Sequence, residues 1–475
     1  MNEQSEKYRE TNNMNRRNFL KLAGGAAVLS TSGLASLSAV NAAGGGENPR
    51  DVVLIITDQQ HLDTIAAGGN PYINTPALDA ILENGVSFTE SYCSNPVCSP
   101  ARSSIFSGRT SSETGVYTNG NPIRMEIPNL GQWVSQETDM ETVYAGKWHL
   151  PRGFTHFIPG FRVLNSGISG QGNVCDTSTS MACDAYIRNL SPSENYLMVA
   201  SFMQPHDICE WLRLNTYVPD EFRYPDIQDD LPPLPPNFTF DFDEPEAVKE
   251  KRAGRDPFKG GWTELQWRYY IWSYYRHIEQ VDAEVGRILQ ALEDTGRRED
   301  TLIIFTSDHG EGVGEHQMVR KSFLYDAAVA VPFLISWPKG IPQNRTNRDA
   351  LVSGMDIFPT ICDYLGIDTP EIQRGTSVRP VIEYDAPGND FVISEARTNR
   401  GRMVRTNQYK YISFYQDSTD RLFDMKNDPH ELNNLAADGR HADVLKHHRQ
   451  ILSEWEQNLD VHPDVPRRDA WWYGE

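Results

Sequence analysis

The stretch from Cys98 to Arg102 combines a thiol, a helix start and a guanidinium. Pro100 suits the first helical position and Ser99 the N-cap, so a helix is predicted to begin here and to end at Gly108. A helix N-terminus favours an anion, and a side chain four residues further on lies on the same helix face. Cys98 and Arg102 are therefore candidates for anion chemistry. The simpler alternative is a buried thiol beside a surface arginine.

Polar side chains also follow two strongly apolar runs. Asp58 and Gln59 come directly after one run, and Asp308 and His309 come after another. In open α/β sheets the working residues gather beyond the carboxyl ends of the strands. Oxygen donors with one imidazole suit a hard divalent ion such as Ca²⁺ or Mg²⁺ better than zinc. These four residues are predicted metal ligands, although a single Asp after a strand is more often a turn or a helix cap.

Lys147, His149 and His206 follow two further strand candidates. The two-residue spacing lets Lys147 and His149 point the same way in an extended segment. A lone histidine is usually structural, so His206 is a candidate only because the other residues accompany it.

The runs that place these residues are short, almost wholly apolar and of β-branched type, as in strands buried on both faces. They span 51–57, 142–145, 196–202, 301–307 and 333–337. Helical patterns lie between them, and the clearest begins at Thr263, where Gln266 completes a capping box, and continues with an expected break to Leu292. The predicted fold is α/β, with a large, mostly parallel sheet sandwiched by helices.

After about residue 380 the pattern changes. Short strand candidates at 391–395, 402–406, 409–414 and 422–424 are separated by turn residues, and a helix follows from about Arg440. This predicts a smaller antiparallel sheet with one helix. The predicted domains are a catalytic domain over 44–380 and a C-terminal subdomain over 381–475. The acidic, proline-rich region 217–257 is predicted to be an irregular excursion over the surface.

The formal net charge of −21 repels nucleic acid and anionic membranes at long range. We therefore expect no nucleic-acid partner, and an anionic substrate must be held by a local basic pocket.

The N-terminus looks like a bacterial twin-arginine export signal. Arg16 and Arg17 precede a run rich in glycine, alanine and serine, with small residues up to Ala43. We predict a signal peptide over 1–43, export of the folded protein by the twin-arginine machinery, and a periplasmic or secreted location. Glycine and serine interrupt the run, so no stable membrane anchor is expected, although an uncleaved anchor is the alternative reading.

The string Cys98-x-Pro100-x-Arg102 resembles the signature of the type I sulfatases of the alkaline phosphatase superfamily. In that family the cysteine is oxidised to formylglycine, the catalytic aldehyde. The resemblance thus implies a formylglycine-generating enzyme as a partner, which must act in the cytoplasm before folding and export.

The stretches 57–59 and 307–310 resemble the metal-binding stretches of the same family, and the resemblance runs from about Asp51 to Ala436. The chain departs from the commonest pattern at Gln59, where many members have a second Asp, but Gln can still ligate through its carbonyl oxygen. The resemblance implies one divalent metal, Ca²⁺ or alternatively Mg²⁺. Its implied ligands are Asp58, Gln59, Cys98, Asp308 and His309.

The family also implies roles for the basic residues. Arg102, Lys147 and Lys321 would spread the charge of the transferring sulfuryl group together with the metal. His206 would protonate the departing alcohol. His149 would take a proton from the hydrated aldehyde, so that the sulfated intermediate collapses to sulfate and aldehyde.

The implied activity is that of an exported sulfatase, a hydrolase of sulfate monoesters, with O-sulfated carbohydrate as the expected substrate. One alternative is a phosphonate or phosphate monoester hydrolase of the same superfamily. The other is a catalytically silent binder of sulfated glycans.

Overall fold

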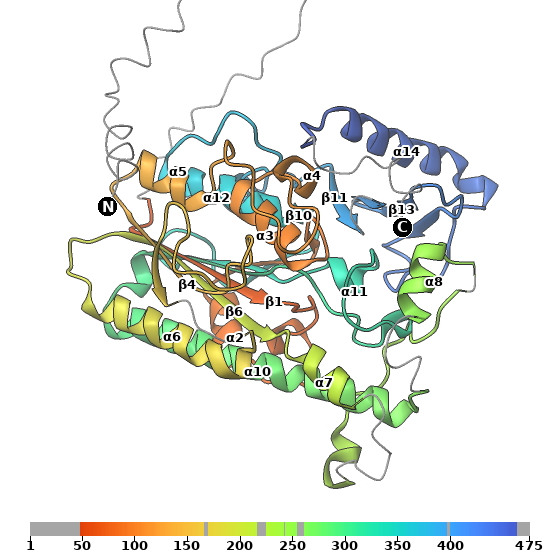
Figure 1. Cartoon of the computed structure of the whole chain (residues 1–475), viewed down its shortest axis with the longest axis horizontal. Helices are drawn as coiled ribbons and strands as arrows, with labels where there is room; N and C mark the ends of the chain where they lie inside the picture. The colour runs from red at the N-terminus through yellow and green to blue at the C-terminus, as the bar shows by residue number, and fades with distance from the viewer. Residues whose placement is uncertain are drawn as a thin grey trace, which may run out of the picture. The chain divides into compact units, whose positions relative to one another are not determined.

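The structure is a computed structural model, and it describes residues 48–165, 170–215, 225–241, 243–253, 261–396 and 400–462. Residues 47–475 form one compact unit, whose elements are drawn in Figure 1. The predicted signal peptide lies outside the described residues. Among the residues described, no helix is both long and apolar enough to cross a membrane. The predicted boundaries after residues 43 and 380 stay predictions.

An eight-stranded sheet forms the centre of this unit, in the order β5-β4-β6-β1-β7-β8-β2-β9. In this order, the neighbouring strands β5, β4, β6, β1 and β7 are parallel, and β8 runs antiparallel to both of its neighbours, β7 and β2. The two short strands β3 and β10 pair separately. This confirms the predicted mostly parallel sheet. The strands are β1 (Asp51–Asp58), β2 (Gly85–Phe88), β3 (Ser91–Tyr92), β4 (Glu141–Gly146), β5 (Arg162–Asn165), β6 (Tyr196–Pro205), β7 (Thr301–Ser307), β8 (Phe333–Ser336), β9 (Arg345–Asn347) and β10 (Val352–Ser353).

Alternate side chains of the central strand β1 enter two different hydrophobic layers. Val52, Leu54 and Ile56 pack into one cluster, whereas Val53 and Ile55 pack into the other. This alternation follows from the two-residue period of a strand. Because both faces are covered, the strand reads as a continuous apolar run, and its polar residues are confined to its ends.

Helices cover both faces of the sheet (Figure 1). The helices α2, α6 and α10 contribute to one hydrophobic layer, and α3, α5, α12 and α13 contribute to the other. The α-helices described are α2 (Pro76–Glu83), α3 (Cys98–Ser107), α4 (Ser111–Thr114), α5 (Leu130–Glu137), α6 (Gly172–Asn189), α7 (Ile208–Asn215), α8 (Glu246–Ala253), α10 (Glu264–Asp294), α11 (Asp326–Val329), α12 (Ile357–Leu365), α13 (Arg379–Tyr384) and α14 (Ala442–Gln457).

The helix α10 starts as predicted, because Thr263 and Gln266 form the capping box. The expected break is absent, and the helix is continuous over 31 residues. Its buried residues include Trp267, Tyr270 and Tyr274 in the first half and Val285 in the second. Burial along its whole length accounts for the continuity, because tertiary packing supplies most helix stability.

The region 217–257 is not irregular throughout, since it contains α8. This helix begins after Pro245 with Glu246 in its first turn, and Arg252 in its last turn pairs with the buried Glu244. An acid at the start and a base at the end suit the helix dipole. The residues 216–224, 242 and 254–260 lie outside the description.

The C-terminal part forms the predicted antiparallel sheet, in the order β11-β12-β13-β14, with α14 against it. These strands are β11 (Phe391–Ala396), β12 (Gly401–Thr406), β13 (Tyr409–Phe414) and β14 (Arg421–Asp424). An ion cluster joins this sheet to the start of α11, because the buried Lys410 pairs with both Asp326 and Glu431. Glu431 also accepts the Asp326 amide at 2.7 Å.

Candidate active site

The helix α3 carries the candidate nucleophile in its first turn. It begins at Cys98 rather than at Pro100, and Val97 occupies the N-cap position without a side-chain hydrogen bond. The predicted Ser99 cap is wrong, because the amide of Ser99 donates to Asn119 Oδ1 at 3.0 Å, so a distant loop caps this helix. Gly108 ends the helix in the left-handed conformation, as predicted.

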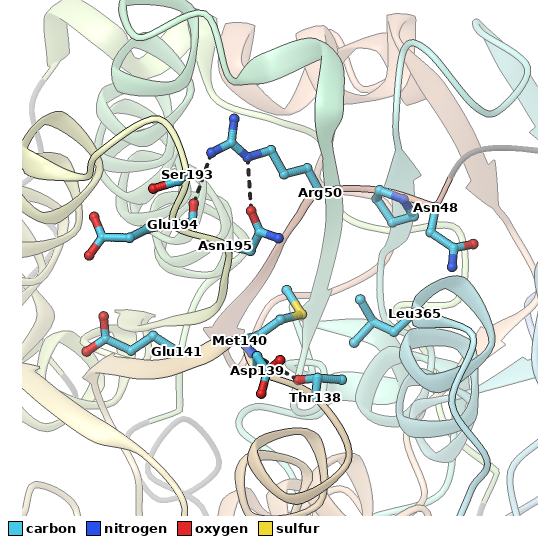
Figure 2. Close-up of a pocket in the computed structure, with 11 residues that line it drawn as sticks. Asn48, Arg50, Thr138, Asp139, Met140, Glu141, Ser193, Glu194, Asn195 and Leu365 are labelled. Carbon is cyan, nitrogen blue, oxygen red and sulfur yellow. Dashed lines mark hydrogen bonds between the residues drawn. The ribbon is translucent and has the colours of Figure 1, made fainter.

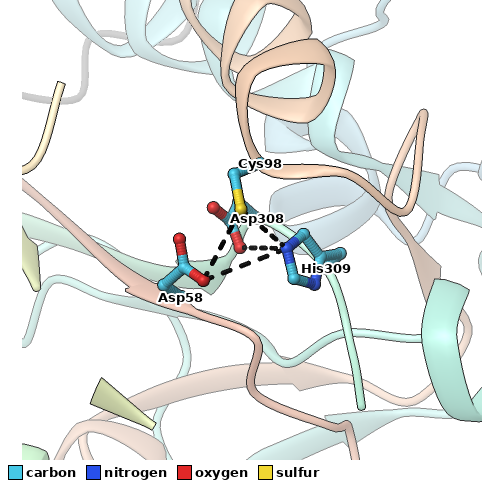
Figure 3. A group of neighbouring side chains, drawn as sticks. All are labelled: Asp58, Cys98, Asp308 and His309. Carbon is cyan, nitrogen blue, oxygen red and sulfur yellow. Dashed lines mark hydrogen bonds and ion pairs between the residues drawn. The ribbon is translucent and has the colours of Figure 1, made fainter. Parts of the chain in front are cut away.

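Four predicted metal ligands converge in a buried cluster (Figure 3). One ligand atom from each of Asp58, Cys98, Asp308 and His309 lies within 4.8 Å of all the others. Asp58 ends β1 and Asp308 follows β7, and these two strands are neighbours in the sheet. The sheet topology therefore brings together residues that are 250 positions apart.

The donor set of this cluster fits a hard divalent cation. Besides the thiol of Cys98, it offers two carboxylates and one imidazole, all three with no measurable solvent exposure. His309 Nδ1 lies 2.9 Å from the carbonyl oxygen of Gly310, to which it can donate, and this leaves Nε2 facing Cys98 Sγ at 3.3 Å. A histidine held by Nδ1 in this way presents Nε2 as a neutral ligand.

Arg102 lies beneath the cluster and is fully buried. Its Nε donates to Asp308 Oδ2 at 2.8 Å, and its Nη2 lies 3.4 Å from Asp58 Oδ2. Its Nη1 donates to the carbonyl of Lys147 and to Ser201 Oγ. Arg102 thus holds two carboxylates of the candidate metal site in place, and its predicted contact with the sulfuryl group stays a prediction.

Two lysines enter the cluster from different segments. Lys147 follows β4, and its ammonium bonds to Asp58 Oδ2. Lys321 lies 3.1 Å from Cys98 Sγ, 3.8 Å from Asp58 Oδ1 and 2.7 Å from Gln59 Oε1. The predicted ligand Gln59 is therefore connected to the cluster through Lys321, and its own backbone amide donates to Asp308 Oδ1 at 3.1 Å.

The other two predicted histidines, His149 and His206, are placed by different contacts. His149 has a left-handed backbone with φ 65°, and its carbonyl accepts a hydrogen bond from Ser99 Oγ at 2.6 Å. Its Nδ1 is buried without a hydrogen-bond partner among the described residues. His206 follows β6, and the charges of Lys321 and Asp58 act on its imidazole.

The charges around Cys98 favour an anion there. Burial and Asp58 oppose ionisation of the thiol, but Lys147 and Lys321 hold the pKa of Cys98 well below its usual range. Burial, and then Lys321, lowers the pKa of His206 to about 3, so this imidazole is neutral at pH 7. The site therefore combines two ammonium groups that favour an anion at Cys98 with a neutral imidazole at His206.

The sequence reasoning missed Glu311 and Cys209. Glu311 is fully buried and accepts hydrogen bonds from the Gln59 side chain and from Tyr270. Cys209, on α7, lies 3.3 Å from Gln59 Nε2. Glu311 follows Asp308 by three residues, and an acidic residue this close to a buried strand end could have been predicted to join the site. No sequence pattern indicated Cys209.

A cavity of about 570 Å³ lies away from this cluster (Figure 2). Its lining includes residues at the amino ends of β4 and β6, such as Glu141 and Asn195, and none of the predicted site residues. Arg50 already bonds there to Asn195 and to the carbonyl of Glu194. The cavity is at the edge of the sheet opposite the carboxyl ends of the parallel strands.

Comparison with known proteins identifies the family of the chain. The Sulfatase family matches residues 50–367, and a second family, described as "N-sulphoglucosamine sulphohydrolase, C-terminal", matches residues 314–458. A Delta 4,5-hexuronate-2-O-sulfatase from Bacteroides thetaiotaomicron is 30% identical over 444 residues, which cover 88% of this chain and 91% of that protein.

Two solved structures are also similar. A 2-O GAG sulfatase superposes with a TM-score of 0.77 at 27% identity, over 89% of this chain and 96% of the other. A phosphonate monoester hydrolase of Agrobacterium radiobacter superposes with a TM-score of 0.71 at 25% identity, over 86% and 96%. The match to the Sulfatase family over most of the chain shows that the protein belongs to the sulfatase family and is a sulfuric ester hydrolase.

Proposed function

We propose that the protein hydrolyses O-sulfate esters of carbohydrates, with a formylglycine made from Cys98 and one divalent cation. The observation that carries this proposal is the position of Cys98 in the first turn of α3, 3.1 Å from Lys321 and 3.3 Å from His309. A thiol that served only to fill the core would be surrounded by apolar side chains, whereas this one has metal-type ligands and an ammonium around it.

The cation would be held by Asp58, Gln59, Asp308 and His309, with the modified side chain at position 98 adjoining. Ca²⁺ is the first candidate and Mg²⁺ the second, because the donors are mainly hard oxygens. When bound, the cation would polarise an oxygen and lower the pKa of a hydroxyl. The formylglycine would supply a second oxygen on the same carbon, which a cysteine or serine lacks.

The chain's own residues provide charge and proton acceptors. Lys147 and Lys321 offset the negative charge of a sulfate ester and remain close to it as charge develops. Arg102 acts through its ion pairs, which hold the carboxylates of Asp58 and Asp308 in place. An anionic substrate near His206 would raise the pKa of its imidazole and so prepare it to protonate the leaving alcohol. His149, whose Nδ1 is buried, is the candidate acceptor for the proton of the hydrated aldehyde.

The substrate class is supported by the relatives. The hexuronate 2-O-sulfatase and the 2-O GAG sulfatase bear names that refer to sulfated sugars, and both cover nearly the whole chain. The negative net charge of this chain disfavours an extended polyanion. We therefore propose a small sulfated sugar or a chain end as the substrate.

The phosphonate monoester hydrolase remains the second candidate function. Its structure covers this chain almost as completely as the sulfatase does, at 25% identity. The two activities differ in the atom attacked, so they are separated by assaying sulfate release and phosphate release on the same preparation.

The decisive experiment is co-expression with a formylglycine-generating enzyme, followed by mass analysis of the peptide across Cys98 and by assays on a panel of sulfated sugars and an aryl phosphate. The aldehyde peptide, with sulfate release abolished in Cys98→Ala, is the expected result. Cys93→Ala is the matched control, because Cys93 is also buried but lies outside the Cys-x-Pro-x-Arg string. Unmodified Cys98, or phosphate release faster than sulfate release, would contradict the proposal.

We also propose export by the twin-arginine machinery, on the strength of the sequence alone. The change of Arg16 and Arg17 together to lysine should retain the protein in the cytoplasm. Fractionation of cells measures this, and an unchanged distribution would count against the signal.

A further inference from the structure

The side-chain amide of Gln59 lies between a hydrogen-bond acceptor, Glu311, and a hydrogen-bond donor, Lys321. Its Nε2 donates to Glu311 Oε2, and its Oε1 accepts from Lys321 Nζ at 2.7 Å. A carboxylate can only accept and an ammonium can only donate. The orientation of a Gln amide is assigned from such contacts, and here both contacts place Nε2 toward Glu311 and Oε1 toward Lys321.

Glu311 is itself fixed, and its two oxygens have different partners. Oε1 accepts from the Gly312 amide at 3.0 Å, from the Arg320 amide and from the Tyr270 hydroxyl. Oε2 accepts from Gln59. Three donors thus hold one oxygen of a fully buried side chain, and the other oxygen is left to Gln59.

We propose that Glu311 is a positioning residue that turns the carbonyl oxygen of Gln59 toward the cation site. The inference rests on the proposed cation site. The ammonium that Gln59 Oε1 contacts also touches Cys98 and Asp58, so this oxygen faces the cluster. The reverse orientation would place an NH₂ group against Lys321 and against any cation held there.

The arrangement predicts an unusual mutational pattern. In Glu311→Gln the same three donors still require an acceptor at Oε1, so the introduced NH₂ must face Gln59 and reverse its amide. In Gln59→Glu two carboxylates meet, acceptor against acceptor. In the double variant the introduced NH₂ donates to the introduced carboxylate, whose second oxygen again faces the cation. Each single change should therefore weaken cation binding, and the two changes together should restore it.

The test is a double-mutant cycle on purified, unmodified protein. Calorimetric titration with Ca²⁺, and separately with Mg²⁺, gives the Kd, which depends on neither turnover nor formylglycine. Loss of a group that orients a ligand typically weakens metal binding by about 10–100-fold, and we expect this for each single variant and a Kd within about threefold of wild type for the double variant. Thermal unfolding in EDTA provides a second cycle, in which the double variant should also recover the Tm lost by the singles.

Glu395→Gln is the matched control, because Glu395 is a buried carboxylate that pairs with Arg402 away from the cluster, and the Ca²⁺ affinity should not change. A Glu311→Gln variant that binds Ca²⁺ as wild type does, or a double variant whose losses are the sum of the two singles, would overturn the role of Glu311. A wild-type protein that binds neither ion would instead overturn the cation site, and with it this part of the proposed function.

Discussion

Replacement of Arg102 by methionine should destabilise the protein strongly, whatever its effect on activity. The side chain keeps a similar length but loses its donors to Asp308, Asp58, Ser201 and the carbonyl of Lys147. All of these contacts are buried, so water cannot replace the lost donors. Lys147 still pairs with Asp58, and the loss therefore falls mainly on Asp308.

The magnitude follows from the burial of the pair. Both side chains of the Arg102–Asp308 ion pair have no solvent exposure, and the Nε–Oδ2 distance is 2.8 Å. Removal of one partner from a buried pair leaves an uncompensated charge and costs about 3–5 kcal/mol of unfolding free energy. Arg102→Lys should fall between wild type and Arg102→Met, because one ammonium cannot reach all four acceptors.

Urea unfolding followed by tryptophan fluorescence, in EDTA so that bound metal does not contribute, measures this difference. Arg345→Met is the matched control, because Arg345 pairs with Asp385 at the surface, where the aspartate side chain is 74% exposed. Such a pair contributes about 0–1 kcal/mol. If the two methionine variants were within about 1 kcal/mol of each other, the reasoning from burial would be refuted.

Three further predictions concern the metal, the leaving group and pH. Chelation should abolish sulfate release and lower the Tm, and Ca²⁺ in about 100-fold excess over its Kd should restore about 2.7 kcal/mol of stability; activity that persists in EDTA would contradict this. His206→Ala should slow hydrolysis of a sugar sulfate by about 10²–10⁴-fold but that of 4-nitrophenyl sulfate far less, because a good leaving group needs no acid; equal losses in the two assays would exclude the acid role. Burial raises the pKa of Asp282 from 3.8 to about 6, so its favourable contribution is present below pH 3.8 and is lost as the pH rises through 6. The stability of wild type relative to Asp282→Asn should therefore fall by at most about 3 kcal/mol between pH 4 and 7 in urea titrations, and a pH-independent difference would be evidence against the shift.

Much of the cluster was predictable because strand ends carry their own signal. Asp58 and Asp308 each follow an apolar run, and the carboxyl ends of parallel strands share one edge of a sheet. The sequence did not give the strand order, which places β1 directly beside β7. That order depends on the packing of helices that connect strands far apart in the chain.

The contacts made by loops were not predictable. Asn119 caps α3 from 20 residues away, and this is why the helix starts at Cys98 and not at Pro100. The position of Glu311 against Gln59 depends on the path of the loop after β7, which no periodic pattern encodes. Similarly, the two acids around Lys410 come from separate segments, and only the folded chain brings them together.

The burial of Cys98 sets a time limit on any enzyme that modifies it. The side chain is 1% exposed in the folded protein, so a modifying enzyme must reach it before the site closes. His309, which contacts it, is synthesised 211 residues later. At about 5–20 residues per second, the ribosome needs roughly 10–40 s to supply the residues that complete the enclosure. During that interval His309 cannot yet cover Cys98, and the order of synthesis would keep the Cys98 stretch accessible to such an enzyme.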